Sequence, residues 1–334
     1  MDAVGLAAII GGVVGGSLLL SCCAACCVWG RAFSLGRRRR KPKAGTSQVV
    51  LLVGDSLTQG TISFPFSEEL MRRFPTVHFV NSGINGDPSY RILERLPGCL
   101  KEPECASLKA AVVLCGTNDT IAMLHPKLAE TLYAGKLGDL RGRSAGWVTV
   151  SIYESNLRAI VRQLRAKHAA VIIVSPPLLG EVLPPAPPPS HPSYGPLSAL
   201  PNGLLAEIAD AAKRVANEEG VVYVPLLEEL SARLCTALSA PGRRAFEFDA
   251  RMGQLTQAAW NVLKYKLLGR SWDALSNCEH THDAIHLNER GGAVFLDLLE
   301  PALEKLVAEA SEQADPGPSG GASDSGSLAA PLMS

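Results

Sequence analysis

The stretch VVLLVGDSLTQG, residues 49–60, joins an unbroken apolar run to a sharp polar turn. A short apolar run bounded by glycine is typical of a strand that is covered on both faces, as parallel strands are. Ser56 follows directly where this strand is expected to end, so its hydroxyl is a candidate nucleophile. The fold prediction starts from this strand and its serine-bearing turn.

Four further apolar runs follow the first one, and helix-like stretches separate them. The runs lie at about residues 77–81, 110–115, 170–175 and 221–225, and the helices are expected at residues 67–74, 90–100, 150–168, 204–219, 255–268 and 288–308. Strands that alternate with helices predict right-handed crossovers and a parallel sheet between two helical layers. We therefore expect an α/β fold, a flavodoxin-like three-layer α/β/α sandwich with a five-stranded parallel sheet.

Polar clusters also follow the second and third strand-like runs. They read NSGINGD at residues 81–87 and GTND at residues 116–119. Because loops that leave the carboxyl ends of parallel strands share one rim, Gly86 and Asn118 should lie near Ser56. The backbone N–H groups of Ser56 and Gly86 and the side-chain amide of Asn118 can then donate to a developing oxyanion.

The base expected to activate the serine lies near the far end of the chain, in DAIHLN at residues 283–288. His286 is the candidate, since a histidine pKa lies close to neutrality. Asp283, three positions earlier, can bind the other ring nitrogen and stabilise the imidazolium that forms during attack. Nucleophile, base, acid and two polar donors are thus all present.

These four blocks, GDSLTQG, NGD, GTND and DAIHLN, resemble the SGNH (GDSL-type) hydrolase family, in which Ser, Gly, Asn and His follow in that order. The resemblance covers about residues 48–305 and is closest to the thioesterase, lysophospholipase and arylesterase branch. It implies a serine ester hydrolase that works through an acyl-enzyme intermediate. By this resemblance Ser56, Asp283 and His286 form the catalytic triad, and Ser56, Gly86 and Asn118 form the oxyanion hole.

The histidine-rich segment before the last helix allows two other interpretations. Glu279 and His282 form a second acid-x-x-His pair, although the Leu-Asn pair that follows His286 matches the family. Cys278 and His280, together with His282 and His286, can also be read as a metal site. That set lacks the paired spacing of zinc modules and would consume the base. We therefore expect neither a metal nor an organic cofactor.

The N-terminal segment predicts a membrane anchor. Residues 3–30 carry no charged side chain, and a spanning helix needs about 20 apolar residues. The basic block at residues 37–41 favours a cytoplasmic flank, which would place the catalytic domain in the cytoplasm and let the flank contact anionic headgroups. A cleaved signal peptide, giving a secreted or lumenal enzyme, is the alternative, but the basic residues expected before the apolar run are missing.

The predicted domain organisation follows from these segments and from composition. Residues 176–201 are rich in proline and leave the end of the fourth predicted strand, so they are either a lid over the site or a surface excursion. The tail has a composition that cannot bury enough apolar surface to fold. The division is a transmembrane anchor at 1–30, a basic linker at 31–47, a hydrolase domain at 48–310 with the proline-rich insertion, and a disordered tail at 311–334.

The composition is typical of a globular protein and indicates which kinds of partner to expect. The 334 residues are 47% apolar and 19% charged, as in globular proteins, and the 32 basic residues equal the 32 acidic ones. This balance gives no reason to expect a nucleic-acid partner. We expect a small-molecule ester as substrate, namely a lipid-derived ester, an acyl thioester or an acetylated sugar. The alternative is a non-catalytic, membrane-anchored binding module that recruits partners through the proline-rich loop.

Overall fold

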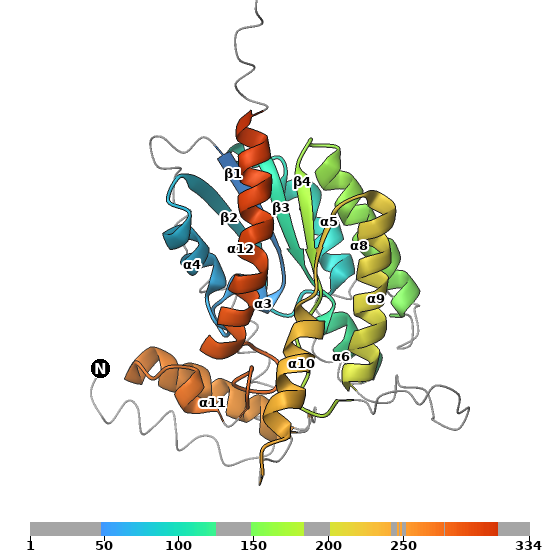
Figure 1. Cartoon of the computed structure of the whole chain (residues 1–334). Helices are drawn as coiled ribbons and strands as arrows, with labels where there is room; N and C mark the ends of the chain where they lie inside the picture. The colour runs from blue at the N-terminus through green and yellow to red at the C-terminus, as the bar shows by residue number, and fades with distance from the viewer. Residues whose placement is uncertain are drawn as a thin grey trace, which may run out of the picture.

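The computed structural model describes residues 48–124, 148–183, 201–241, 246, 248, 252–276 and 278–312. Five parallel strands form one sheet in the order β2-β1-β3-β4-β5, with helices on both of its faces (Figure 1). The strands are β1 (Gln48–Gly54), β2 (Val77–Gly83), β3 (Leu108–Leu114), β4 (Ala170–Val174) and β5 (Val222–Val224). The predicted α/β class and five-stranded parallel sheet are therefore confirmed, and the strand order is that of flavodoxin-like folds.

All six predicted helices are present, and three more occur among the described residues. The helices are α3 (Ser56–Gln59), α4 (Phe66–Arg73), α5 (Ser89–Cys99), α6 (Thr117–Leu124), α8 (Val150–Arg165), α9 (Pro201–Glu219), α10 (Leu226–Leu238), α11 (Met252–Leu268) and α12 (Glu289–Glu312), with short 3-10 turns η1 (Pro103–Cys105) and η4 (Asp273–Leu275). Helices α3, α6 and α10 were not predicted from the sequence. Helix α10 carries buried leucines at 226, 227, 230 and 234, a helical spacing that the sequence already contained.

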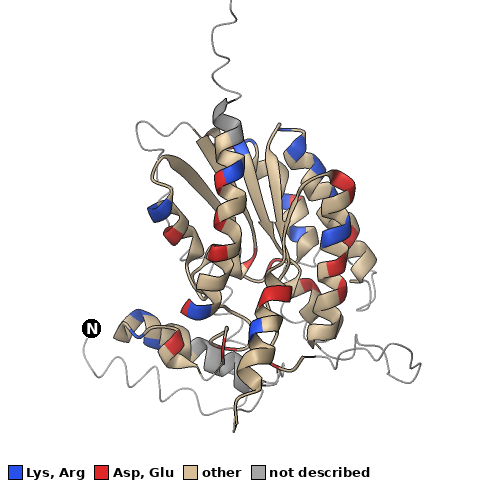
Figure 2. Ribbon diagram, viewed as in Figure 1, with Lys and Arg blue, Asp and Glu red and all other residues tan. Residues whose placement is uncertain are grey.

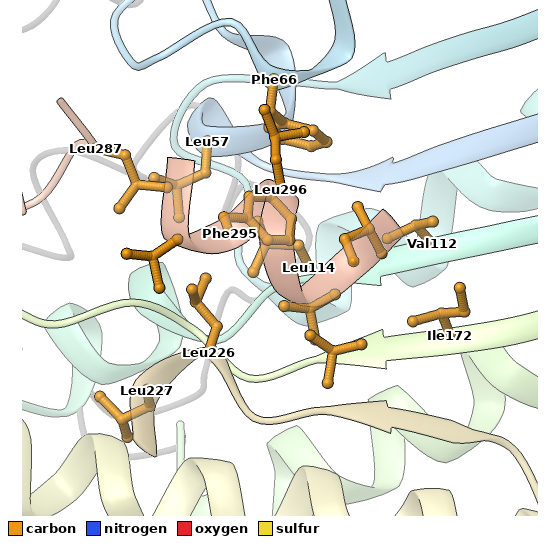
Figure 3. Packing of buried hydrophobic residues seen from close by; sticks show 14 of the residues in the cluster. Leu57, Phe66, Val112, Leu114, Ile172, Leu226, Leu227, Leu287, Phe295 and Leu296 are labelled. Atoms are coloured by element: carbon orange, nitrogen blue, oxygen red, sulfur yellow. The ribbon is translucent and has the colours of Figure 1, made fainter. Parts of the chain in front are cut away.

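The core consists of two apolar layers, one on each face of the sheet. Alternate residues of β1 point to opposite layers, so Leu52 packs in the layer that contains Phe66 and Phe295, while Leu51 packs in the layer that contains Leu157. The rings of Phe66 and Phe295 meet edge to face with centroids 4.6 Å apart, between α4 and α12 (Figure 3). Burial on both faces explains why the strands read as continuous apolar runs.

Several predictions fall outside the described residues. They concern the apolar segment and basic linker at 1–47, most of the proline-rich insertion, at 184–200, and the tail at 313–334. In the described parts of the chain, no helix combines the length and the apolarity that a bilayer span requires. The first element of the described chain is β1, which begins at Gln48.

The carboxyl ends of the strands meet at one rim of the sheet. Helices α3 and α6 start at this rim, and α11 and the beginning of α12 lie beyond it (Figure 1). The polar clusters that follow β1, β2 and β3 therefore lie at the same end of the molecule as the segment that precedes α12.

Candidate active site

Ser56 lies at the turn between β1 and α3. Asp55 caps this helix, because its Oδ1 accepts the backbone N–H of Leu57 at 3.0 Å, so Ser56 is the first helical residue and not the cap. A side chain at Gly54 would place its Cβ 2.4 Å from the carbonyl oxygen of Leu114, which explains the glycine. The turn thus brings Ser56 to the rim, where its side chain is buried among the polar clusters.

Asp283 and His286 lie on a tight loop between η4 and α12. Ala284 takes a left-handed conformation with φ 70°, which turns the chain back so that Asp283 Oδ1 accepts the N–H groups of Ile285 (3.0 Å) and His286 (2.7 Å). The other carboxylate oxygen lies 2.7 Å from His286 Nδ1, and His286 Nε2 lies 3.0 Å from Ser56 Oγ. Since a carboxylate accepts, we assign the proton to Nδ1 and the lone pair to Nε2, facing the serine.

The acid and the base shift each other's pKa in opposite directions. Burial alone would raise the pKa of Asp283, but the neighbouring His282 and His286 and the hydrogen bonds from His286 hold it well below its usual range. Burial alone would lower the pKa of His286, but the charge of Asp283, its hydrogen bond to the ring and the charge of Asp55 together outweigh this effect, so the pKa is raised above its ordinary value. The site therefore favours an ionised acid beside a histidine that readily takes up a proton.

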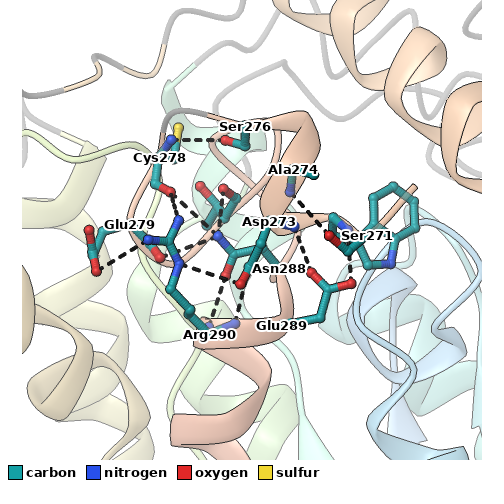
Figure 4. A network of polar contacts seen from close by, with 12 residues as sticks. Ser271, Asp273, Ala274, Ser276, Cys278, Glu279, Asn288, Glu289 and Arg290 are labelled. Atoms are coloured by element: carbon teal, nitrogen blue, oxygen red, sulfur yellow. Dashed lines mark hydrogen bonds and ion pairs between the residues drawn. The ribbon is translucent and has the colours of Figure 1, made fainter.

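A network of polar contacts fixes the loop that carries Asp283 and His286 (Figure 4). The Asn288 side-chain amide donates to the backbone oxygens of Cys278 (3.4 Å), Glu279 (3.2 Å) and Thr281 (3.3 Å). The carboxylate of Glu289 accepts the N–H groups of Trp272 (2.8 Å) and Asp273 (2.6 Å), while Arg290 Nη2 donates to the Cys278 oxygen at 2.9 Å. The first residues of α12 thus hold the loop against the chain that precedes it.

Gly86 and Asn118 follow β2 and β3 at the same rim. Gly86 has a left-handed φ of 70°, a conformation that favours glycine, in the turn between β2 and α5. Asn118 lies in the first turn of α6, and its Nδ2 lies 3.0 Å from Asp55 Oδ2 and 3.3 Å from the Asp87 carbonyl oxygen. The Asn118 amide therefore joins the turn that carries Ser56 to the turn that carries Gly86.

Two ionisable side chains shape this rim, and neither of them was assigned a role from the sequence. Arg95, on α5, donates to the Gly54 carbonyl oxygen (2.8 Å) and to Ser82 Oγ (2.8 Å), and its Nε pairs with Asp87 Oδ2 at 2.7 Å. Burial raises the pKa of Asp55 to about 7, although the bonds from Leu57 and Asn118 oppose the shift. Arg95 has no sequence signal of its own, because its partners come from the ends of two different strands and the turn after one of them.

His282 has a different part in the loop from His286. Its Nε2 lies 2.8 Å from the Ile62 carbonyl oxygen, which can only accept, so this nitrogen carries the proton. The ring stacks on Trp272 with centroids 4.1 Å apart, and burial lowers its pKa. His282 is therefore neutral and bound to the segment that follows α3, while His286 is the histidine that faces Ser56.

The structure limits the metal interpretation to a smaller set of residues. Ligand atoms of His282, Asp283 and His286 all lie within 4.8 Å of one another, a separation that a metal ion could bridge. This group does not include Cys278 and His280, which the sequence had offered as further ligands in the rejected metal interpretation. It also coincides with the Asp283–His286 hydrogen bond of 2.7 Å, so an ion would have to replace that bond.

The described start of the proline-rich insertion contacts the histidine loop. The N–H of Gly180 donates to the Ala284 carbonyl oxygen at 2.8 Å, and a Glu181 carboxylate oxygen accepts the N–H of Glu279. The insertion thus begins beside Asp283 and His286, as its position after β4 predicted. A lid over the site stays a prediction, since residues 184–200 lie outside the described chain.

Comparisons with known proteins match the part of the chain that contains the four sequence blocks. The model of the GDSL-like Lipase/Acylhydrolase family matches residues 52–294, and no curated protein matches the chain. Solved structures with a similar fold include LAE5, an alpha/beta hydrolase enzyme from the metagenome of Lake Arreo in Spain. It is 16% identical and covers 79% of this chain and 98% of its own, with a TM-score of 0.46.

Two further solved structures are similar to the same extent. A variant of an acetyl xylan esterase from Geobacillus stearothermophilus is 15% identical, covers 78% of this chain and 95% of its own, and has a TM-score of 0.46. The lipase/acylhydrolase from Enterococcus faecalis is 17% identical, covers 77% of this chain and 96% of its own, and has a TM-score of 0.44. The family match spans most of the chain and all five predicted site residues. The chain therefore belongs to the GDSL-like lipase/acylhydrolase family and is an ester-hydrolysing enzyme.

Proposed function

We propose that this enzyme hydrolyses carboxylic esters with Ser56 as nucleophile, His286 as general base and acid, and Asp283 as the group that orients His286. The observation that supports the proposal is the continuous chain of hydrogen bonds from Ser56 Oγ to His286 Nε2 (3.0 Å) and from His286 Nδ1 to Asp283 Oδ2 (2.7 Å). A free serine hydroxyl is a weak nucleophile, and a base within hydrogen-bond reach removes this obstacle.

In the first half of the reaction, Ser56 Oγ attacks the ester carbonyl carbon while His286 Nε2 takes the hydroxyl proton. The tetrahedral intermediate collapses to an acyl-serine, and the alcohol leaves with the proton that His286 returns to it. In the second half, water attacks the acyl-serine and gives its proton to His286, which passes it to Ser56 as the carboxylic acid leaves. Asp283 stays ionised throughout and stabilises the imidazolium.

The proposed oxyanion donors are the backbone N–H groups of Ser56 and Gly86 and the Asn118 amide. Donors aimed at the charge that develops in the transition state are usually the largest single contribution to catalysis. The Asn118 amide lies close to two acceptors, and its separation of 3.3 Å from the Asp87 oxygen is the longer of the two. We expect this weaker contact to yield when the oxyanion forms.

The proposed substrates are lipid-derived esters, acyl thioesters or acetylated sugars. The apolar sequence of residues 3–30 and the basic block that follows it favour a membrane-anchored enzyme with its catalytic domain in the cytoplasm. Detection of the intact N-terminus in a membrane fraction would support the anchor, and recovery of a shortened, soluble form would exclude it.

To test the mechanism, the full chain in detergent is assayed for turnover of p-nitrophenyl acetate and for labelling by a fluorophosphonate probe. We expect Ser56→Ala to abolish both turnover and labelling, because only a serine that is activated by a base reacts quickly with the probe. The matched control is Ser67→Ala, which removes a buried hydroxyl that accepts Asn81 Nδ2 at 2.9 Å. If Ser56→Ala keeps the parent rate, the mechanism is wrong, and the non-catalytic binding module becomes the better hypothesis.

A further inference from the structure

Helix α11 exposes a stripe of large apolar side chains. Among the described residues, four of the five exposed large hydrophobic residues lie on this one helix, namely Trp260 (53% exposed), Leu263 (42%), Leu267 (66%) and Leu268 (68%). Positions separated by three or four residues lie on the same side of a helix, so these side chains form one stripe, here called the α11 stripe. Single exposed apolar residues are common, but a contiguous group marks an interaction surface.

The charges of α11 have one sign. From Met252 to Arg270 the sequence contains Lys264, Lys266 and Arg270 and no acidic residue. Helices α8 and α9 differ, because their charges have both signs (Figure 2). These charges pair across the two helices, as in Arg158–Glu218 (2.5 Å) and Arg162–Glu219 (2.8 Å). The α11 stripe therefore lies on a positively charged helix. Its apolar side chains and nearby basic groups match a partner with an apolar interior and a negatively charged surface.

The other side of α11 is fixed to the catalytic loop. Asn261 Nδ2 donates to the His282 carbonyl oxygen at 2.8 Å, and the Tyr265 ring stacks on Trp272 at 4.1 Å with planes only 10° apart. Trp272 stacks in turn on His282, whose N–H donates to the His286 carbonyl oxygen at 2.9 Å. The stripe is thus presented to solvent by a helix that is bonded directly to the loop of the general base.

We propose that the α11 stripe docks on the surface of an anionic lipid bilayer. Tryptophan and leucine side chains on one side of a helix, with lysine and arginine nearby, are the chemistry of helices that lie in the plane of a membrane interface. Lysine stems can lie along the apolar surface while their ammonium groups reach the phosphates. Docking would hold the rim that carries Ser56 at the lipid surface. If the proposed function is correct, the preferred substrates are then esters presented in the bilayer.

The decisive measurement is the depth of Trp260 in vesicles. The full chain carries the changes Trp29→Phe and Trp147→Phe, so that only Trp260 and the buried Trp272 emit, and it is reconstituted in vesicles whose phosphatidylglycerol bears brominated acyl chains. We expect these chains to quench a large part of the emission. The same protein with Trp260→Phe should lose that part, because quenching by bromine requires close contact. This readout does not depend on catalysis or on the N-terminal anchor.

Two variants of the stripe test its chemistry. Leu267→Ser with Leu268→Ser, and separately Lys264→Glu with Arg270→Glu, should each reduce the quenching of Trp260 at least about fivefold. Replacing the vesicles by neutral phosphatidylcholine with the same brominated chains should have a similar effect on the parent protein. The matched control is Lys213→Glu, which reverses an exposed charge on α9 and should leave the quenching unchanged. All variants should hydrolyse soluble p-nitrophenyl acetate at the parent rate, whereas a vesicle-embedded ester should be hydrolysed more slowly by the stripe variants.

Three results would overturn the proposal. Equal quenching with Trp260 and with Trp260→Phe would show that the stripe stays outside the bilayer. Protection of Trp260 from aqueous iodide in the absence of vesicles would show that another segment of the chain covers it. Self-association that disappears in the double serine variant would show that a second copy is the partner. Loss of Ser56 chemistry alone would leave the quenching intact, so the two proposals fail separately.

Discussion

The replacement Asp283→Asn tests the proposed triad most sharply, because the structure dictates how the new amide must be oriented. Oδ1 of Asp283 accepts two backbone N–H groups, at 3.0 and 2.7 Å, while among the described residues Oδ2 accepts from His286 Nδ1 alone. An asparagine that keeps its oxygen on the backbone retains both bonds. The opposite orientation loses both bonds, at a cost of about 1 kcal/mol or more each, and places the new amide NH₂ against the backbone N–H groups of Ile285 and His286.

The favoured orientation turns the amide NH₂ toward His286 Nδ1. The ring must then carry its proton on Nε2, which faces Ser56 Oγ at 3.0 Å and can no longer accept the hydroxyl proton. The same exchange in a serine protease triad lowers kcat about ten-thousandfold, and we expect a similar loss of about 5 kcal/mol in transition-state stabilisation. Because two backbone bonds are retained, the unfolding midpoint should change little.

The assay is turnover of p-nitrophenyl acetate by the full chain, with denaturant unfolding of the same preparations. Asp273→Asn is the control, since its carboxylate lies in the same segment but accepts the Arg290 backbone N–H at 3.3 Å and, within the described chain, contacts no histidine. It should keep kcat within about threefold of the parent. A loss of less than tenfold in a folded Asp283→Asn protein would refute the assigned role of Asp283.

Three further predictions concern the donor, the base and the core. Asn118→Ala should lower kcat/KM for the same ester about 100- to 1,000-fold if the amide stabilises the oxyanion, and an unchanged value would remove it from the oxyanion hole. Because His286 must be neutral to act as base, kcat/KM should fall as pH drops below its raised pKa. Since the charge of Asp55 helps to raise that pKa, Asp55→Asn should move the fall to lower pH, unlike the exposed Asp297→Asn. A pH profile that is the same for both would contradict this coupling. Phe295→Ala should reduce the free energy of unfolding by about 3 to 5 kcal/mol, measured with denaturant, because the side chain is fully buried against Phe66, and the half-buried Leu298→Ala should cost less. A smaller loss for Phe295→Ala would place the core elsewhere.

Three of the candidate site residues were predicted from the sequence because the blocks that carry them each follow a strand. In a parallel sheet the connectivity alone brings Ser56, Gly86 and Asn118 to one rim, since all three come just after the carboxyl end of a strand. Asp283 and His286 also share a local relation, because a spacing of three lets a carboxylate reach both a backbone N–H and a ring nitrogen in one turn. Local spacing and topology are both readable in a sequence.

Other features depend on contacts between segments that are distant in the chain. Arg95 reaches Gly54, 41 residues away, and His282 reaches Ile62, 220 residues away, so no local pattern could have predicted either bond. The buried Asp55 acquires a pKa of about 7 only because the fold removes it from water. The exposure of the α11 stripe is likewise a tertiary property, because its apolar spacing is the same as that of a core helix.

The sequence by itself determined the parallel sheet and the order of its strands along the chain, and it predicted the candidate site residues, because apolar runs and polar turns are local signals that each element displays alone. The tertiary structure alone decided how His282 and the Asn118 amide are held, which ionisable groups change their pKa and which side of α11 meets the solvent. These outcomes depend on distances and burial between segments far apart in the chain, and sequence order fixes neither.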